Sequence, residues 1–350
     1  MSALRIGSVC TGYGGLDMAV QQVFGGGPAW VADLDPGAAR VLDHHFSQVP
    51  NLGDITALDW RDVAPVDVLT GGYPCQPFSV AGRRKGTADE RHIWPYIADA
   101  LRVLRPRVAV FENVAGHLRL GFSDVLADLA ALGFNAEWTT VRASDVGAPH
   151  QRERLFILAA AQDADGPVGH QWGVAAPGQA ESRRARPDAG GRGGAPVADA
   201  AGDGHGNARP PRERRVAAAA VAGGHPVDAD ANRVGLEEQQ RGEPGMGARG
   251  DADGRGPERW GRFAPGIARW EAVTGLRAPW ATDDRGRLSP AFVEWMMGLD
   301  PGHVTAVPGL SRNAQLKALG NGVVPLQAAR ALTVLRRRIA DAAHPYRQAA

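Results

Sequence analysis

The chain has 350 residues, of which 44% are hydrophobic and 22% are charged, and its formal net charge is +1. This length can bury a sizeable core and form about two domains. It contains no apolar run long enough to span a membrane and no expected signal peptide, and its two cysteines, Cys10 and Cys75, argue against a disulfide framework. The composition therefore indicates a reducing compartment, while the near-neutral charge neither predicts nor excludes a nucleic-acid partner.

The first predicted strand, over Leu4 to Val9, leads into a glycine-rich turn at residues 10–17 and a helix that reaches Phe24. Strand, glycine-rich turn and helix in this order are typical of folds that bind nucleotide cofactors, because bare backbone lets a ligand approach the helix N-terminus. The spacing of the glycines does not match G-x-G-x-x-G, and this counts against NAD.

A second strand is predicted over Ala29 to Ala32, and a helix over Gly37 to Phe46. Asp33 and Asp35 lie between them, and either could bind a ribose hydroxyl or cap the helix. Asp35 precedes a proline, as capping residues often do, so we assign Asp35 to the cap and Asp33 to ribose. Asp54 lies on a Gly-Asp turn, where an ordinary Asx-turn is the simpler interpretation.

The third predicted strand, Val66 to Leu69, is expected to end at Gly71-Gly72 and lead into Tyr-Pro-Cys-Gln-Pro. Cys75 would then lie at the carboxyl end of a strand, where α/β sheets place their ligands. The prolines on both sides of Cys75-Gln76 disfavour helix and stiffen the backbone. Because an isolated cysteine is more often a buried filler than a nucleophile, the assignment of Cys75 depends on the rest of the chain.

Residues 81–91 are basic and glycine-hinged, which favours a lid that meets phosphates or a solvated loop. Further helices and strands are predicted over residues 93–104, 108–111, 123–132, 134–141 and 155–159. The strand at 108–111 should end just before Glu112. Arg152 and Arg154 come just before the last strand, where a spacing of two residues puts them on one face or in a surface pair with Glu153.

Residues 162–260 are rich in Gly, Ala, Pro, Arg and Asp. A loose Asp-x-Asp repeat suggests calcium loops, but the closing glutamate is missing, so low-complexity sequence is the better interpretation. We expect the tryptophans that follow to be core residues more often than base-stacking ones: Trp260, Trp270 and Trp280. The last predicted elements are a helix over Pro290 to Met297 capped by Ser289, a turn at 320–325 and a helix over Leu326 to Ile339.

The order of these motifs closely resembles the cytosine-C5 DNA methyltransferases over residues 4–160 and about 285–335. Pro-Cys-Gln, Glu-Asn-Val and Gln-Arg-Glu-Arg follow one another at the family's distances, and Gly-Asn-x-Val-Val-Pro comes after a long variable insert. The resemblance implies a Rossmann-like, doubly wound, mostly parallel α/β sheet with a smaller irregular recognition domain. The implied division is a catalytic domain at 1–160, a target-recognition insert at 161–287 and a C-terminal return at 288–350.

The resemblance implies transfer of a methyl group from S-adenosylmethionine to C5 of a cytosine flipped out of double-stranded DNA. Cys75 would add to C6 of the base, and Glu112 would hold a proton toward N3 and the exocyclic amine. Arg154 would meet the base carbonyl O2, and Arg152 would support the same pocket or the loop. No metal is implied. The implied cofactor residues are Cys10, Thr11, Gly12, Tyr13, Gly14, Gly15, Asp33, Leu34, Asp54, Ile55, Pro74 and Asn321.

Two positions depart from the family or bear on its adenine site. Cys10 stands where the family usually has Phe, and we expect Tyr13 to compensate for the missing aromatic wall beside the adenine. Leu34 lies where a large apolar side chain often covers that ring.

The resemblance also implies a monomer in the cytoplasm of a prokaryote or phage-infected host, with a cognate restriction endonuclease as a candidate partner. Three alternatives stay open: the same chemistry on RNA such as tRNA, a non-catalytic DNA-binding relative, and a nicotinamide oxidoreductase.

Overall fold

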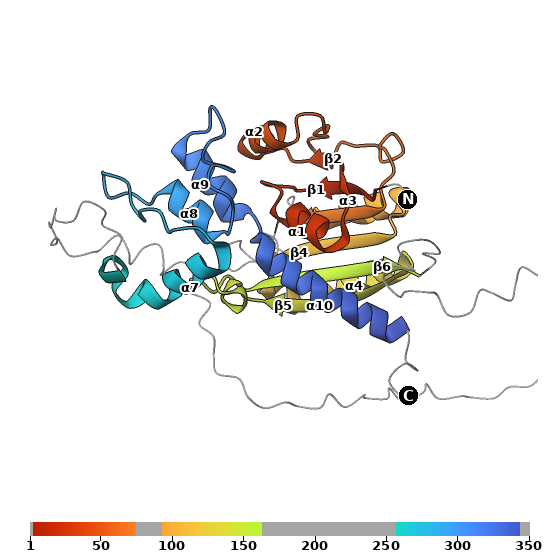
Figure 1. Ribbon diagram of the computed structural model, residues 1–350. Coiled ribbons are helices and arrows are strands. Elements are labelled where there is room, and N and C mark those ends of the chain that lie inside the picture. The colour runs from red at the N-terminus through yellow and green to blue at the C-terminus, as the bar shows by residue number, and fades with distance from the viewer. Residues whose placement is uncertain (1–2, 75–92, 163–256, 344–350) are drawn as a thin grey trace, which may run out of the picture. The chain divides into compact units, whose positions relative to one another are not determined.

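The computed structural model describes residues 3–74, 93–162 and 257–343 (Figure 1). The chain divides into two compact units, one of Met1–Pro177 with Arg249–Ala350 and one of Gly178–Ala248, and every described residue belongs to the first. These bounds differ from the expected insert at 161–287, whose recognition role stays a prediction. Within the described ranges, no helix is both long and apolar enough for a bilayer crossing.

Six strands of the described chain form one sheet in the order β2-β1-β3-β4-β6-β5. Their bounds are β1 Arg5–Val9, β2 Gly27–Ala32, β3 Val68–Gly72, β4 Val108–Val114, β5 Phe134–Val141 and β6 Arg154–Ala161. Strands β1 to β4 pair in parallel, and β6 runs antiparallel to both β4 and β5. The fold is therefore the predicted mostly parallel, doubly wound sheet. Its direction of winding reverses at β1 and β3, where such sheets bind ligands.

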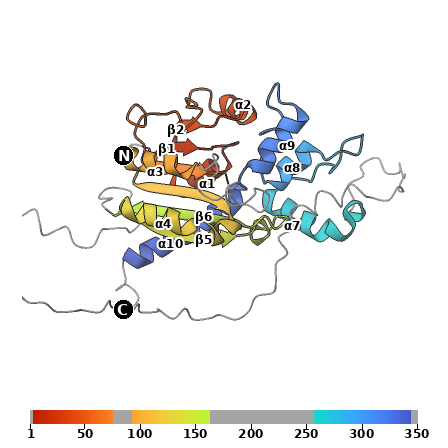
Figure 2. The same cartoon turned by 180° about the vertical axis from the view of Figure 1, so that it is seen from behind.

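The α-helices of the described chain are α1 Gly15–Phe24, α2 Pro36–His45, α3 Trp94–Leu104, α4 Phe122–Ala131, α7 Ala264–Thr274, α8 Pro290–Met296, α9 Arg312–Asn321 and α10 Pro325–Ala343. Short 3₁₀ turns cover Ala115–Arg119, Ala143–Val146 and Pro257–Phe263. Helices α1 and α10 cross one face of the sheet, and α3 and α4 cover the other (Figures 1 and 2).

The two layers of helices follow from the alternation of side chains along each strand. In β4, Val108 and Val110 join the core beneath α1 and α10, whereas Ala109 and Phe111 join the core beneath α3 and α4. Because both faces are buried, the central strands are apolar without a break, as parallel strands in α/β proteins are.

A third core gathers α7, α8 and α9 with residues of the N-terminal half of the chain. Trp270 is fully buried and its Nε1 donates a hydrogen bond to the carbonyl of Trp295, 2.9 Å away. Trp260 is half-buried and stacks on Phe292. The expectation of core tryptophans is thus confirmed for Trp270, whereas it is wrong for Trp280, which is 59% exposed.

Two predicted caps are confirmed, since the Asp35 carboxylate accepts from the backbone N–H groups of Gly37 and Ala38, and Ser289 caps α8. Helices α7 and α9 were not predicted. Two strand ends are also corrected: β3 runs through the glycines that were expected to end it, and β4 runs on to Val114. Gly71 lies in the strand through its pairing with Val9 and Phe111, and glycine suits this position because a Cβ there would lie only 2.8 Å from Cγ2 of Val9.

Candidate active site

Gly72 marks the centre of the candidate site. It pairs with Glu112 of β4 at the end of β3. A Cβ on Gly72 would lie 3.5 Å from Oε2 of Glu112 and 3.9 Å from both the carbonyl of Cys10 and Cγ2 of Val323. The absence of that carbon leaves open the space where the β1 turn, the acid on β4 and the C-terminal segment meet.

Glu112 and Arg154 form a nearly buried ion pair beside this space. The register of β4 and β6 places them near each other, and Nε of Arg154 lies 2.9 Å from Oε1 of Glu112. The side chain of Arg154 is only 15% exposed and that of Glu112 only 10%. Burial raises the pKa of Glu112, as expected from the sequence, while Arg154 and then Arg152 act in the opposite direction. The site thus holds a buried carboxyl group on which burial and two arginine charges act in opposite directions.

Arg152 braces the turn at the end of α9. Its backbone has a positive φ of 38°, and its Nη2 donates to the carbonyls of Gly320 and Gly322 at 2.8 Å and 2.6 Å. Burial lowers the pKa of this guanidinium to about 10, and its Nε is buried without a hydrogen-bond partner. The structure thus shows Arg152 holding the C-terminal turn, and its predicted support of the base pocket or of the 81–91 loop stays a prediction.

Tyr13 joins the glycine-rich turn to the same C-terminal segment. The residue is fully buried, and its hydroxyl donates to the carbonyl of Val323 at 2.6 Å. The ring packs so closely that a Cβ on Gly322 would overlap it, and a Cβ on Gly15 would overlap the Val323 carbonyl. The expectation that the Tyr13 ring replaces the missing aromatic wall is therefore wrong, because the ring is fully buried and does not line the cavity beside the glycine-rich turn.

We predict that Gly322→Ala destabilises the protein by about 1–3 kcal/mol, the usual range for overpacking. The matched control is Gly320→Ala in α9, where a Cβ would meet nothing within 4 Å and alanine favours helix, so no loss is expected. Urea denaturation of the two variants beside the parent checks this. Equal stabilities of the two variants would contradict the packing of Tyr13 described above.

Asp33 and Asp54 lie around Cys10 at the open rim of the site. Asp33 accepts from the N–H groups of Gly12 and Asp35 at 2.8 Å and 2.9 Å. Asp54 accepts from both the N–H and the hydroxyl of Thr56, as in the Asx-turn considered from the sequence. Burial, followed by the charges of Asp33 and Asp54, raises the pKa of the Cys10 thiol to about 12. Both carboxylates thus act electrostatically on Cys10 and keep lone pairs for hydroxyl or amino groups of a ligand.

The other predicted cofactor residues differ in exposure. Leu34 is 68% exposed, which fits its predicted contact with a ligand ring. Pro74 and Asn321 are also exposed. Ile55, by contrast, is only 4% exposed and packs in the core. A small cavity of about 20 Å³ lies where the glycine-rich turn meets the C-terminal segment. It is lined by Ser8, Cys10, Thr11, Gly12, Leu16, Asp17, Gly72, Asn321, Gly322 and Val323.

Three polar residues to which the sequence analysis assigned no role hold the chain just ahead of Cys75. The Tyr73 hydroxyl lies 2.8 Å from Nε2 of His117, and Nδ2 of Asn113 donates to the Tyr73 carbonyl at 3.3 Å. All three are buried. A histidine five residues after Glu112 was the available signal. Cys75 itself and the basic segment at 81–91 lie outside the described residues.

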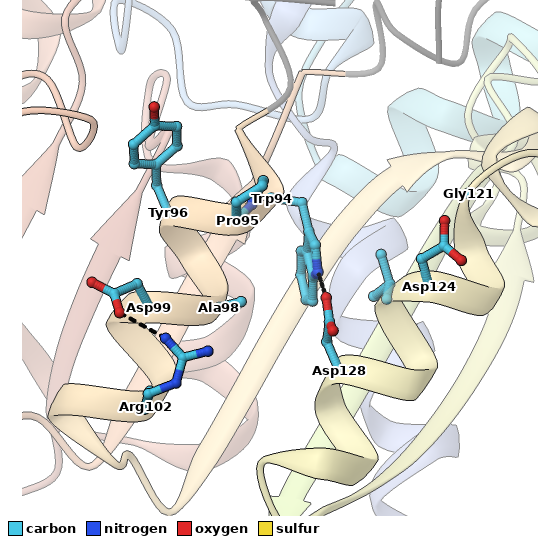
Figure 3. A pocket seen from close by; sticks show the side chains of 10 residues that line it. Trp94, Pro95, Tyr96, Ala98, Asp99, Arg102, Gly121, Asp124 and Asp128 are labelled. Atoms are coloured by element: carbon cyan, nitrogen blue, oxygen red, sulfur yellow. Dashed lines mark hydrogen bonds and ion pairs between the residues drawn. The ribbon is translucent and has the colours of Figure 1, made fainter. Parts of the chain in front are cut away.

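A second cavity, of about 510 Å³, lies between α3 and α4 and shares no residue with the candidate site (Figure 3). Trp94 donates its Nε1 hydrogen to Asp128 at 2.8 Å, and Arg102 pairs with Asp99 at 2.7 Å. This larger cavity therefore holds none of the residues predicted to carry the chemistry.

The family model for C-5 cytosine-specific DNA methylase matches residues 4–179. The chain is 33% identical over 175 residues to the Type II methyltransferase M.NaeI of Lentzea aerocolonigenes, covering 48% of this chain and 42% of that protein. It is 36% identical over 134 residues to M.BsuFI of Bacillus subtilis, covering 36% and 32%. The matches thus span less than half the length of these relatives.

The crystal structure of S. pombe Dnmt2 methyltransferase supports the fold assignment. It superposes with a TM-score of 0.53 at 16% identity and covers 95% of this chain and 99% of that one. The likeness concerns the fold alone, since the identity is low. The match to the family model over half of this chain shows that the chain belongs to the C-5 cytosine-specific DNA methylase family.

Proposed function

We propose that this protein transfers a methyl group from S-adenosylmethionine to C5 of cytosine in double-stranded DNA, through a Cys75 adduct at C6 of a flipped base. The observation that carries the proposal is the buried Glu112–Arg154 pair, which lies beside the strand end that leads directly into Pro74 and Cys75. A nucleophile, a proton-holding carboxyl group and a cation are the groups that this reaction needs.

The chemistry follows from the weakness of cytosine C5 as a nucleophile. Addition of the Cys75 thiolate to C6 would raise the electron density at C5, which can then attack an electrophilic methyl group. Glu112 would hold its proton toward N3 as charge develops in the ring, and Arg154 would meet the carbonyl O2. A base then takes the C5 proton, the bond from sulfur to C6 breaks, and the thiolate is regenerated.

The residues at the rim fit an adenosyl ligand. Asp33 has lone pairs left for ribose hydroxyls, and Asp54 is exposed and would take the adenine amine. Gly12 has a positive φ of 61°, and a Cβ there would point into open space, so the turn leaves room for close approach. When bound, S-adenosylmethionine supplies the methyl group, and Leu34 would cover the adenine.

The proposal extends to the setting of the reaction. We expect a monomer that acts on DNA in the cytoplasm at a specific short sequence, with the insert at 161–287 reading the bases. The named relatives are Type II methyltransferases, which supports a place in a restriction-modification system with a cognate endonuclease as partner.

The test is methyl transfer by the purified full chain to matched DNA duplexes and tRNA, with radiolabelled donor, followed by sequencing of modified cytosines in DNA from cells that express it. We expect C5-methylcytosine in DNA at one sequence motif and no transfer to tRNA. Transfer only to tRNA would move the chain to the RNA-modifying alternative, and no transfer to either would favour the non-catalytic one.

A further inference from the structure

His303 joins the C-terminal segment to the glycine-rich turn, and the proposed chemistry assigns it no role. Its Nε2 lies 3.0 Å from the carbonyl oxygen of Tyr13. Because a carbonyl oxygen can only accept, Nε2 carries the hydrogen and donates it. The two residues are 290 positions apart, so this bond ties the turn to the segment between α8 and α9.

The peptide group that His303 holds is the one that leads into α1. Its carbonyl, on Tyr13, accepts from His303, and its N–H, on Gly14, donates to the carbonyl of Thr11 at 3.0 Å. Gly14 is the N-cap of α1 with a φ of 85°, and none of the described side chains caps the helix there. Because glycine is conformationally permissive, the orientation of this peptide plane depends on the hydrogen bonds at its two ends.

A buried carboxylate fixes the loop that carries His303. Glu294 of α8 is only 1% exposed. Its carboxylate accepts hydrogen bonds from the N–H groups of Gly302, Val304 and Thr305 at 2.8, 2.6 and 2.9 Å. The hydroxyl of Thr305 donates to it as well, at 2.7 Å. The backbone on both sides of His303 is therefore tied to α8.

Two neighbouring rings fix the orientation of the His303 imidazole. The His45 ring, at the end of α2, stacks on it with centroids 4.1 Å apart and 12° between the planes. The Tyr13 ring meets it edge to face at 5.8 Å. Nε2 of His45 also donates to the carbonyl of His303 at 2.7 Å. The N–H that meets the turn is thus preorganised by its own surroundings, as the supports of ligand sites are.

We propose that His303 is a positioning residue for the methyl donor and holds the Tyr13–Gly14 peptide in the orientation that the bound ligand requires. The inference rests on the proposed function, in which the glycine-rich turn lies along S-adenosylmethionine. His303 does not line the cavity beside the turn, so it acts through the backbone of the turn. Without this bond, part of the binding free energy would be spent on ordering the turn.

The experiment is calorimetric titration of the full-length protein with S-adenosylmethionine and with S-adenosylhomocysteine. The two ligands differ only in the methyl group on sulfur, so both should depend on the turn equally. His303→Leu removes the hydrogen-bond donor, and we expect both dissociation constants to rise about fivefold to tenfold, the effect of one neutral hydrogen bond. In methyl transfer, KM for the methyl donor should rise by the same factor, with kcat changed by less than about twofold.

His303→Gln tests whether the hydrogen bond itself is responsible. A glutamine amide can present an N–H near the position of Nε2, so this variant should bind both ligands within about twofold of the parent.

His150→Leu is the matched control for loss of stability. Nε2 of His150 donates to the carbonyl of Met296 at 3.0 Å, which is the same kind of bond at the same length, but its partner lies in α8 and not in the turn. Both leucine variants should therefore have lower melting temperatures than the parent, whereas only His303→Leu should bind the two ligands more weakly.

The outcomes separate the inference from the function on which it rests. Ligand binding weakened equally by the two leucine variants would assign the effect to general stability and overturn the inference. So would parent-like binding by His303→Leu, or a glutamine variant as weak as the leucine variant. In each of these cases binding of the methyl donor by the parent protein leaves the proposed function standing. A parent protein that binds neither ligand would overturn both together.

Discussion

Replacing Cys75 by serine is expected to reduce methyl transfer by at least roughly 10⁴-fold, because removal of a covalent nucleophile typically costs this much or more. A serine hydroxyl is not ionised near neutral pH and cannot add to C6 at a useful rate. Single-turnover transfer to a DNA duplex measures the loss. Binding of the same duplex by fluorescence anisotropy should change little, since the substitution alters one atom.

A DNA duplex with 5-fluorocytosine at the target position tests directly whether Cys75 forms the covalent adduct. Fluorine at C5 of the target cytosine cannot leave as a cation, so the adduct at C6 should persist after methyl transfer and migrate as a covalent complex in a denaturing gel. The parent should form this complex, and Cys75→Ser should not. Cys10→Ser is the matched control: burial raises the pKa of the Cys10 thiol to about 12, so it is no nucleophile and capture should still occur. Failure of the parent to be captured would overturn the proposed mechanism.

The fold could be predicted from the sequence wherever a local pattern decided it. The strand over 134–141 and the helix after Asp35 depend on periodicity and a cap, and both are found in the structure. The end of β4 could not be predicted, because Asn113 and Val114 stay in the strand through pairing with β6, about forty residues farther along the chain. A polar residue after an apolar run looks like a strand end unless its partner strand is known.

The candidate site, like the fold, could be predicted from the sequence only in part. The motif order identified Glu112 and Arg154, but it could not show that they pair with each other. It also missed the closure of the N-terminal turn by Tyr13 on Val323, a contact between residues 310 positions apart. Tyrosine in a glycine-rich turn gives no local signal of such a partner, since the packing depends on the glycines at 15 and 322. Residue types and order thus predicted the chemistry, whereas the supports of the site needed the fold.

The second large effect is expected from Arg154→Met. Methionine has a similar length and removes the cation that faces Glu112, so a buried carboxylate is left unpaired. Such losses cost about 3–5 kcal/mol. Arg102→Met is the matched control, because Arg102 pairs with Asp99 at 2.7 Å on an exposed helix surface, with side chains 60% and 52% exposed, and exposed pairs are worth at most about 1 kcal/mol. Denaturant unfolding at pH 8 measures both.

The pH dependence of the stability lost in Arg154→Met shows whether the loss comes from the unpaired charge of Glu112. Burial already raises the pKa of Glu112, and without Arg154 it should rise further, so the folded variant takes up a proton that the unfolded chain releases. Relative to the parent, the variant should therefore lose stability as pH rises above the ordinary glutamate range, and its deficit should be smaller at pH 5 than at pH 8.

Glu112→Gln tests the acid function of Glu112 independently of its ion pair with Arg154. The amide keeps the size and places no charge in the buried site, so combining it with Arg154→Met should recover most of the stability that Arg154→Met loses at pH 8. Alone, it cannot deliver a proton to N3, and kcat should fall by about 10²–10⁴-fold. A deficit of Arg154→Met that is the same at pH 5 and pH 8, and that Glu112→Gln does not relieve, would mean that the arginine acts by packing rather than by its charge.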